Sequence, residues 1–140
     1  MALSELVDGL HVRLAARGWD DVRRSYGYVL LALRDAPRTT TELGARLGMT
    51  KQAASKLLDG MEAAGYVRRH SDRRDARAKL VRSTAKGARL LADVEAIYVE
   101  LESGWAAILG ESELERIRRE LEQVVRAGHD GALPPVRPAV

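Results

Sequence analysis

A run of small polar and basic side chains opens one predicted helix. It comprises Thr50, Lys51, Gln52, Ala53, Ser55 and Lys56. Gln can form two hydrogen bonds with adenine, Lys can reach guanine or a phosphate, and the methyl group of Ala can contact thymine. The N-terminal end of the second helix in a helix-turn-helix is the part that reaches base edges in the DNA major groove. We therefore predict that these residues contact DNA. The alternative for Gln52, an ordinary exposed helix residue, stays open.

Three arginines crowd the predicted hairpin that follows: Arg73, Arg74 and Arg77. An Arg on a protruding hairpin can enter a narrow, A·T-rich minor groove, where the potential is most negative. Asp75 precedes Arg77 by two residues and could hold its guanidinium by a paired hydrogen bond. The alternative is a solvated hairpin whose charge pairs contribute little.

Weaker DNA candidates flank these two segments. Thr40, with Arg38 and Thr39, precedes a short predicted helix and could contact phosphates. Arg68 and Arg69 lie on the first strand of the hairpin, where they could face either phosphates or Glu62.

The distribution of charge favours a nucleic-acid partner. Residues 38–89 contain 13 Lys and Arg against 5 Asp and Glu, a net charge of +8, whereas residues 1–37 are neutral and residues 90–140 carry −5. A basic block confined to one module is typical of a phosphate-binding surface. Enzyme classes fit poorly: there is no Cys, the three His lie in different predicted elements, and no Gly-rich phosphate loop is present. We expect no catalytic residues, metal or cofactor.

Hydrophobic spacing predicts the elements that position these residues. Apolar residues at three- and four-residue intervals predict helices over 3–14, 26–33, 43–47, 54–61, 90–108 and 114–125. Thr41, Thr50 and Thr84 are predicted N-caps, and Ser112 is predicted to open the last helix. Short apolar pairs at 66–67 and 80–81 predict the two strands of the hairpin, or wing. The sequence thus predicts a mainly α fold with a small β-hairpin wing: a winged helix-turn-helix lobe plus a terminal helical region.

The terminal helices carry more apolar surface than the central module can cover. A second copy of the chain is the simplest cover, and folding back of these helices onto their own lobe is the alternative. We expect one domain over 1–140, with a helical dimerisation region at 1–35 and 88–127, a winged lobe at 36–87, and a flexible tail at 128–140. No signal peptide or membrane span is evident, so a cytoplasmic location is expected.

The chain resembles the MarR family of bacterial transcriptional regulators over roughly residues 3–127. The resemblance rests on the helix-turn-helix TELGARLGMTKQAASKLLDGMEAAGYVRR, the wing segment DRRDARAKLVRSTAKG and flanking helices of the right length. The most specific wing features are Asp75, Arg77, Thr84 and Lys86-Gly87. One departure is Ser83, where the family usually has Leu.

The resemblance implies a homodimer that binds a palindromic DNA operator, usually as a repressor, with Arg77 in the minor groove and Asp75 orienting it. It also implies release by a small phenolic or aromatic acid bound between the dimerisation region and the DNA lobes. Candidate ligand residues are Trp19, Arg24, Tyr26, Tyr28 and Trp105, and the alternative is that these aromatics are core or interface packing. The alternative function is a winged-helix protein-interaction module without specific DNA binding.

Overall fold

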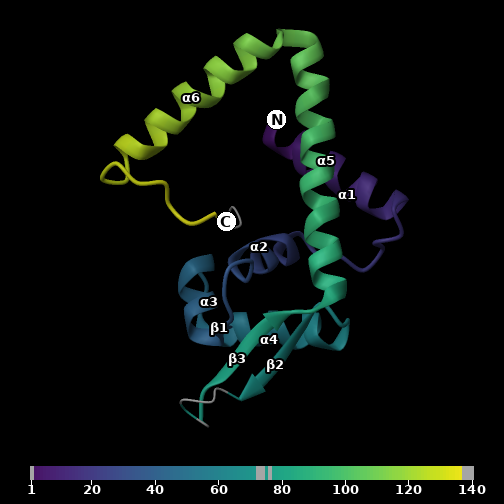
Figure 1. Ribbon diagram of the computed structural model, residues 1–140, viewed down its shortest axis with the longest axis vertical. Helices are drawn as coiled ribbons and strands as arrows, with labels where there is room; N and C mark the ends of the chain where they lie inside the picture. Colours follow the sequence, from purple (N-terminus) through teal and green to yellow (C-terminus); the bar gives the residue numbers. More distant parts are fainter. Residues whose placement is uncertain (1, 72–74, 76, 137–140) are drawn as a thin grey trace.

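The computed structural model describes residues 2–71, 75 and 77–136. Over these residues the chain forms helices with one small antiparallel sheet (Figure 1), which confirms the predicted mainly α winged-helix fold. The elements in chain order are α1 (Ala2–Ala16), α2 (Arg24–Ala32), β1 (Arg38–Thr39), α3 (Thr40–Leu47), α4 (Lys51–Ala63), β2 (Val67–Ser71), β3 (Lys79–Ser83), α5 (Ala85–Leu109) and α6 (Glu111–Ala127).

Helix α3 begins two residues earlier than predicted. Its N-cap is Thr39, whose hydroxyl accepts from the Glu42 N–H at 3.2 Å while the Glu42 carboxylate accepts from the Thr39 N–H at 2.7 Å. The prediction that Thr41 is the cap was wrong, because only Thr39 has a Glu three residues later to complete this reciprocal pair. The predicted cap of α4 is confirmed: the Thr50 hydroxyl accepts from the Ala53 N–H at 3.1 Å.

The turn between α3 and α4 depends on two glycines. Gly48 adopts a left-handed backbone conformation with φ of 68°, which residues other than glycine rarely adopt. On α3, a Cβ at Gly44 would lie 3.1 Å from the Met49 carbonyl oxygen, so this position also favours glycine. The two helices therefore pack closely, and Leu43 and Leu58 are both fully buried.

The sheet has the order β1-β3-β2 with antiparallel neighbours. In the predicted hairpin, Val67 pairs with Ser83 and Ser71 pairs with Lys79. Strand β1 was not predicted, because two residues are too short for an alternating pattern. It joins the sheet by pairing Arg38 with Val81, which ties the start of α3 to the wing.

Helix α5 connects the winged part to the remaining helices. Thr84 is its N-cap, as predicted, and its hydroxyl accepts from the Gly87 N–H at 3.1 Å. Gly110, with φ of 88°, separates α5 from α6, so α6 begins at Glu111 and not at Ser112 as predicted. No side chain caps this start, and the positive φ of Gly110 alone makes the break.

The core lies where α2, α4, β2 and α5 meet. Tyr66 is its largest fully buried side chain, and its hydroxyl donates to Asp21 at 2.5 Å. Burial and this nearby carboxylate raise the Tyr66 pKa above its ordinary value. The loop after α1 is also held to α5, because the Trp19 indole N–H donates to Asp93 at 2.7 Å. The winged part and the long helix are thus joined through buried contacts.

Helix α6 contrasts with this core. It leaves the far end of α5 and runs away from the rest of the chain (Figure 1), and it contains no buried residue. Large apolar side chains stay exposed on α6 and on the neighbouring end of α5: Ile108, Leu109, Leu121, Val124 and Val125. Residues 128–136 continue from α6 as turns and irregular chain. No helix in the described part of the chain is long and apolar enough to cross a membrane.

Candidate nucleic-acid interface

The N-terminal end of α4 presents its predicted DNA-reading residues on one open face. Lys51, Gln52, Ala53 and Lys56 are exposed, and Ser55 is half-buried. On the opposite face Ala54, Leu58 and Met61 are buried in the core. These apolar residues recur at four- and three-residue spacing, so the packing that buries them turns the polar face outward.

The predicted residue Thr40 lies beside this face. It is the first residue of α3 and is half-buried at a polar hollow that Ser55 and Lys79 also line. Its neighbours are already engaged: the Thr39 hydroxyl caps α3, and Arg38 Nε donates to the Ala32 carbonyl at 2.7 Å. Thr40 therefore differs from Thr39 and Arg38, whose side chains are both held by hydrogen bonds to described residues.

The wing carries Asp75 and Arg77 at its exposed tip, whereas Arg73 and Arg74 lie outside the described residues. Asp75 Oδ1 accepts from the backbone N–H of Arg77 at 2.9 Å, and its carbonyl accepts from the Ala78 N–H at 3.0 Å. The contact between Asp75 and Arg77 is therefore made through the main chain, where we predicted a guanidinium pair. Asp75 fixes the turn from which the Arg77 side chain projects.

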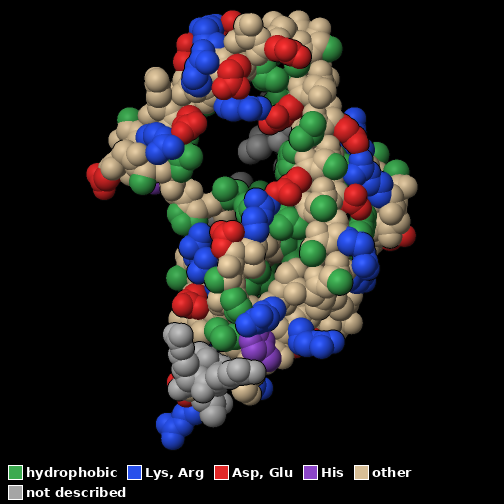
Figure 2. Space-filling model, in the orientation of Figure 1, with side chains coloured by type: hydrophobic (Ala, Val, Ile, Leu, Met, Phe, Trp, Pro, Cys, Tyr) green, Lys and Arg blue, Asp and Glu red, His purple; other side chains and the backbone are tan. Residues whose placement is uncertain are grey.

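The two arginines of β2 have different environments. Arg68 is exposed, while Arg69 has only 17% of its side chain exposed and contacts Glu62 and Asp59 on α4 at 2.7 and 2.8 Å. The sequence left two partners open for Arg69, a phosphate or Glu62, and in the structure Arg69 pairs with the Glu62 carboxylate. In Figure 2, Lys and Arg side chains are spread over the visible face, and some of them lie in the lower part of the molecule, where Figure 1 places β2 and β3.

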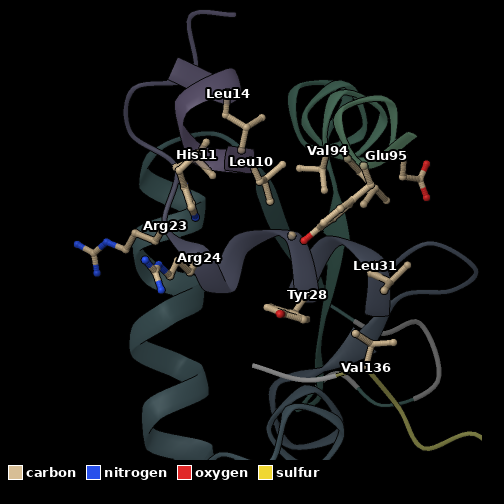
Figure 3. A pocket seen from close by; sticks show the side chains of 14 residues that line it. Leu10, His11, Leu14, Arg23, Arg24, Tyr28, Leu31, Val94, Glu95 and Val136 are labelled. Carbon is tan, nitrogen blue, oxygen red and sulfur yellow. The ribbon is translucent and has the colours of Figure 1, made fainter. Parts of the chain in front are cut away.

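A separate apolar hollow of about 370 Å³ lies between α1, α2 and α5. Figure 3 shows Leu10 and His11 of α1 facing Tyr28 of α2 and Val94 of α5 across it. Arg24 also lines the hollow and donates to Asp8 at 2.7 Å. Burial and the positive charge of Arg24 lower the His11 pKa, and Asp8 opposes this effect.

Two of the five candidate ligand residues, Arg24 and Tyr28, line this hollow. The other three do not. Tyr26 is buried against Tyr66 with ring centroids 5.4 Å apart, Trp19 is bonded to Asp93, and Trp105 is half-exposed far along α5. In the structure, Tyr26 is part of the core and Trp19 packs against it.

Most of the residues that line this hollow were not predicted from the sequence. His11, Leu10 and Leu14 belong to the apolar stripe of the first predicted helix, and Val94 and Tyr98 belong to that of the fifth. The same stripes that predicted core faces therefore also supply the hollow, and nothing in their spacing separates the two. A titratable His11 within an apolar stripe was the one available signal.

The sequence profile of the MarR family matches residues 20–78, the segment that holds α2, β1, α3, α4 and β2 and ends just before β3. The match covers 59 of the 140 residues, so the chain is similar to the MarR family over less than half of its length. Among curated protein sequences, none matches it significantly.

Several solved structures have the same fold as this chain. MepR, a transcription regulator of the Staphylococcus aureus multidrug efflux pump MepA, is 22% identical with a TM-score of 0.73, over 92% of this chain and 94% of that one. MarR from E. coli in its apo form is 23% identical with a TM-score of 0.72, over 87% and 89%. The transcriptional repressor CouR, bound to a 23-mer DNA duplex, is 23% identical with a TM-score of 0.72, over 89% and 87%. These structures share the fold of this chain over most of its length.

Proposed function

We propose that this chain is a MarR-family, sequence-specific DNA-binding regulator, a homodimeric repressor of palindromic operators. The observation that carries the proposal is the exposed face of Lys51, Gln52, Ser55 and Lys56 at the capped start of α4, with the wing beside it. Both lie in the segment of the chain with a net charge of +8. A basic surface gives affinity for any duplex, and the side chains at the start of the helix give base preference.

The exposed apolar residues of α5 and α6 support the homodimer. Leu121 and Val124 of α6 are 61% and 70% exposed, and Ile108 of α5 is 81% exposed. A second copy of the chain would cover this face and place two α4 helices on one DNA, which matches a palindromic operator.

Selection of bound sequences from random duplexes tests this proposal. We expect an inverted repeat whose half-sites are about one helical turn apart, or a multiple of it. Sedimentation at micromolar concentration should give twice the 15.4 kDa of one chain. A monomer that binds a palindrome tightly would contradict the proposed assembly.

Release by a small aromatic acid is the finer part of the proposal. The apolar wall of the hollow between α1, α2 and α5 would accept a ring, while the Arg24 guanidinium would attract a carboxylate and the His11 ring N–H could donate a hydrogen bond to it. Benzoate and hydroxybenzoates are suitable probes in an operator-release titration. Arg24→Met should weaken the response to the acid without changing operator affinity in its absence, and equal release of both proteins would exclude Arg24 from the site.

A protein-interaction module without DNA binding remains the second candidate, since exposed helix faces suit protein partners as well. Affinity for duplex DNA as a function of salt separates the two. A regulator that contacts several phosphates should lose affinity steeply as salt rises. No measurable duplex binding at low salt would favour the protein-interaction module.

A further inference from the structure

Arg69 links β2, the first strand of the wing, to helix α4. Its Nη1 donates to Glu62 Oε2 at 2.7 Å, and its Nη2 lies 2.8 Å from Asp59 Oδ1 and 3.3 Å from the Ser55 carbonyl oxygen. Its backbone N–H donates to Glu62 Oε1 at 2.8 Å. One residue of β2 therefore contacts three residues of α4.

The three α4 residues lie along a single line on the helix. Ser55, Asp59 and Glu62 are separated by four and then three residues, so they occupy one face over about two turns. Ser55 belongs to the predicted reading face, and Glu62 lies at the last turn of α4. A contact that spans this length restrains both rolling and sliding of α4 against β2.

The planar fork of Arg69 suits this task. A guanidinium presents several N–H donors in a fixed plane and can bond two carboxylates and a carbonyl at once, whereas an ammonium acts as a point charge. The half-buried state of Arg69 limits the screening of its contacts by solvent and salt. Its interactions also neutralise two carboxylates on a lobe that would approach DNA phosphates.

We propose that Arg69 is a positioning residue for DNA readout: it fixes the orientation of the α4 reading face relative to the wing and makes no DNA contact itself. This inference rests on the proposed DNA-binding function. Readout requires α4 in the major groove while the wing reaches an adjacent groove. If α4 could move relative to the wing, its side chains would no longer face the same base pairs each time the protein binds, and base preference would weaken.

The first test is Arg69→Lys, with Arg68→Lys as the matched control. Both changes keep the charge, and Arg68 is an exposed neighbour on the opposite face of the wing. Arg69→Lys should lower affinity for the selected operator about tenfold, the loss expected when one base contact is misplaced. Non-specific affinity and its salt slope should be unchanged. Arg68→Lys should leave operator affinity, non-specific affinity and the salt slope unchanged. Full operator affinity in Arg69→Lys would overturn the proposal, since a phosphate contact tolerates Lys.

The second variant, Glu62→Gln, approaches the same contact from α4. It removes a negative charge, so electrostatics alone predicts tighter binding to every duplex by the same factor. Loss of the Arg69 contact predicts that the ratio of operator to non-specific affinity falls. An unchanged ratio would contradict the positioning role. Thermal unfolding of each variant shows that the folded chain is being compared.

A third measurement needs no DNA. Hydrogen exchange of the amides in 59–63 and 67–71 should be faster in Arg69→Lys than in the wild type and in Arg68→Lys. Equal exchange in all three proteins would show that Arg69 does not hold β2 against α4, and would leave the proposed DNA-binding function untouched. Faster exchange together with a wild-type chain that prefers no DNA sequence would overturn the proposed function, and the readout role with it.

Discussion

Gln52 and Lys56 lie about one turn apart on the exposed face of α4, but we expect their side chains to act on DNA in different ways. Gln52→Ala should relax base preference at one position in each half-site, at about 1–3 kcal/mol. Lys56→Ala should weaken all sequences evenly and reduce the salt slope by about one unit per monomer. Selection from random duplexes and salt titrations measure the two effects. An unchanged selected motif for Gln52→Ala would show that Gln52 does not read a base.

The hydrogen bond between Asp75 Oδ1 and the Arg77 N–H makes the wing tip testable with two substitutions. Asp75→Ala removes the acceptor, so binding to operators with A·T-rich flanks should weaken although net positive charge rises. Asp75→Asn keeps an Oδ1 acceptor and removes the charge, so its binding should equal or exceed that of the wild type. Titrations at fixed salt compare the three proteins. If both variants weaken binding alike, the Asp75 charge matters and not the main-chain bond.

His11 gives the fold a pH dependence near neutrality. Its pKa is below 6.5 in the folded chain, mainly because of burial. The unfolded chain therefore binds more protons between that lowered pKa and 6.5, and the free energy of unfolding falls as the pH drops through this window. His11→Gln cannot titrate and should lose less stability on acidification. Urea unfolding at several pH values measures the difference, and parallel curves for the two proteins would contradict it.

At the scale of elements, local chemistry explains which boundaries the sequence predicted. Thr50 and Thr84 each cap a helix with their own hydroxyl, so both starts could be predicted. The start of α3 was predicted too late because Thr39, Thr40 and Thr41 are all suitable N-cap residues by type, and only the Glu42 partner decides among them. Strand β1 depends on pairing with β3, far along the chain, and two residues cannot indicate such a partner.

Ser83 and Gly87 show how the junction between wing and α5 accommodates an unusual residue. A Cβ at Gly87 would lie 2.3 Å from the Tyr66 carbonyl oxygen and 2.6 Å from Ser83 Oγ. The junction is therefore closely packed around a glycine, with the small hydroxyl of Ser83 against it. The sequence marked Ser83 as a departure from the family, but the proximity of these residues depends on how α5 packs on β2 and β3.

This packing predicts opposite effects for two glycines of α5. Gly87→Ala should destabilise the fold by about 1–3 kcal/mol or more, because the Tyr66 carbonyl is backbone and cannot move aside. Gly104→Ala should stabilise it by roughly 0.5–1 kcal/mol, since nothing lies within 4 Å of its Cβ position and Ala favours helix. Chemical denaturation measures both. Equal effects would mean that helix propensity alone governs these positions.

At the scale of the whole molecule, α6 makes the proposed dimer testable. Leu121→Glu places a charge on the exposed apolar face and should shift the chain to monomers. Gln123→Glu adds the same charge at an exposed polar position of α6 and should leave the dimer intact. Sedimentation over a concentration series compares them. A dimeric Leu121→Glu chain would show that this face is not the interface.

The lining of the candidate ligand site could be predicted only in part from the sequence. Arg24 and Tyr28 line the hollow, but Trp19 and Tyr26 turn into the core and Trp105 lies elsewhere on α5. Residue type indicated that an aromatic-rich region was present. Which rings face the hollow depends on how α1 crosses α2 and α5, and that crossing follows from contacts between residues more than 70 positions apart.

The same long-range contacts impose an order on synthesis. Arg17, just after α1, pairs with Asp93 and Glu100 of α5, 76 and 83 residues further along the chain. Helix α1 therefore precedes α5 out of the ribosome, and Arg17 cannot make these ion pairs until α5 has followed it. The segment from α2 to β3 can close its own contacts in the meantime, since nascent chains fold from the N-terminal side as units become complete. A truncated nascent chain would thus acquire a winged lobe before it could acquire helix α6, so the proposed pairing with a second copy through α6 would become possible only once translation has passed that helix.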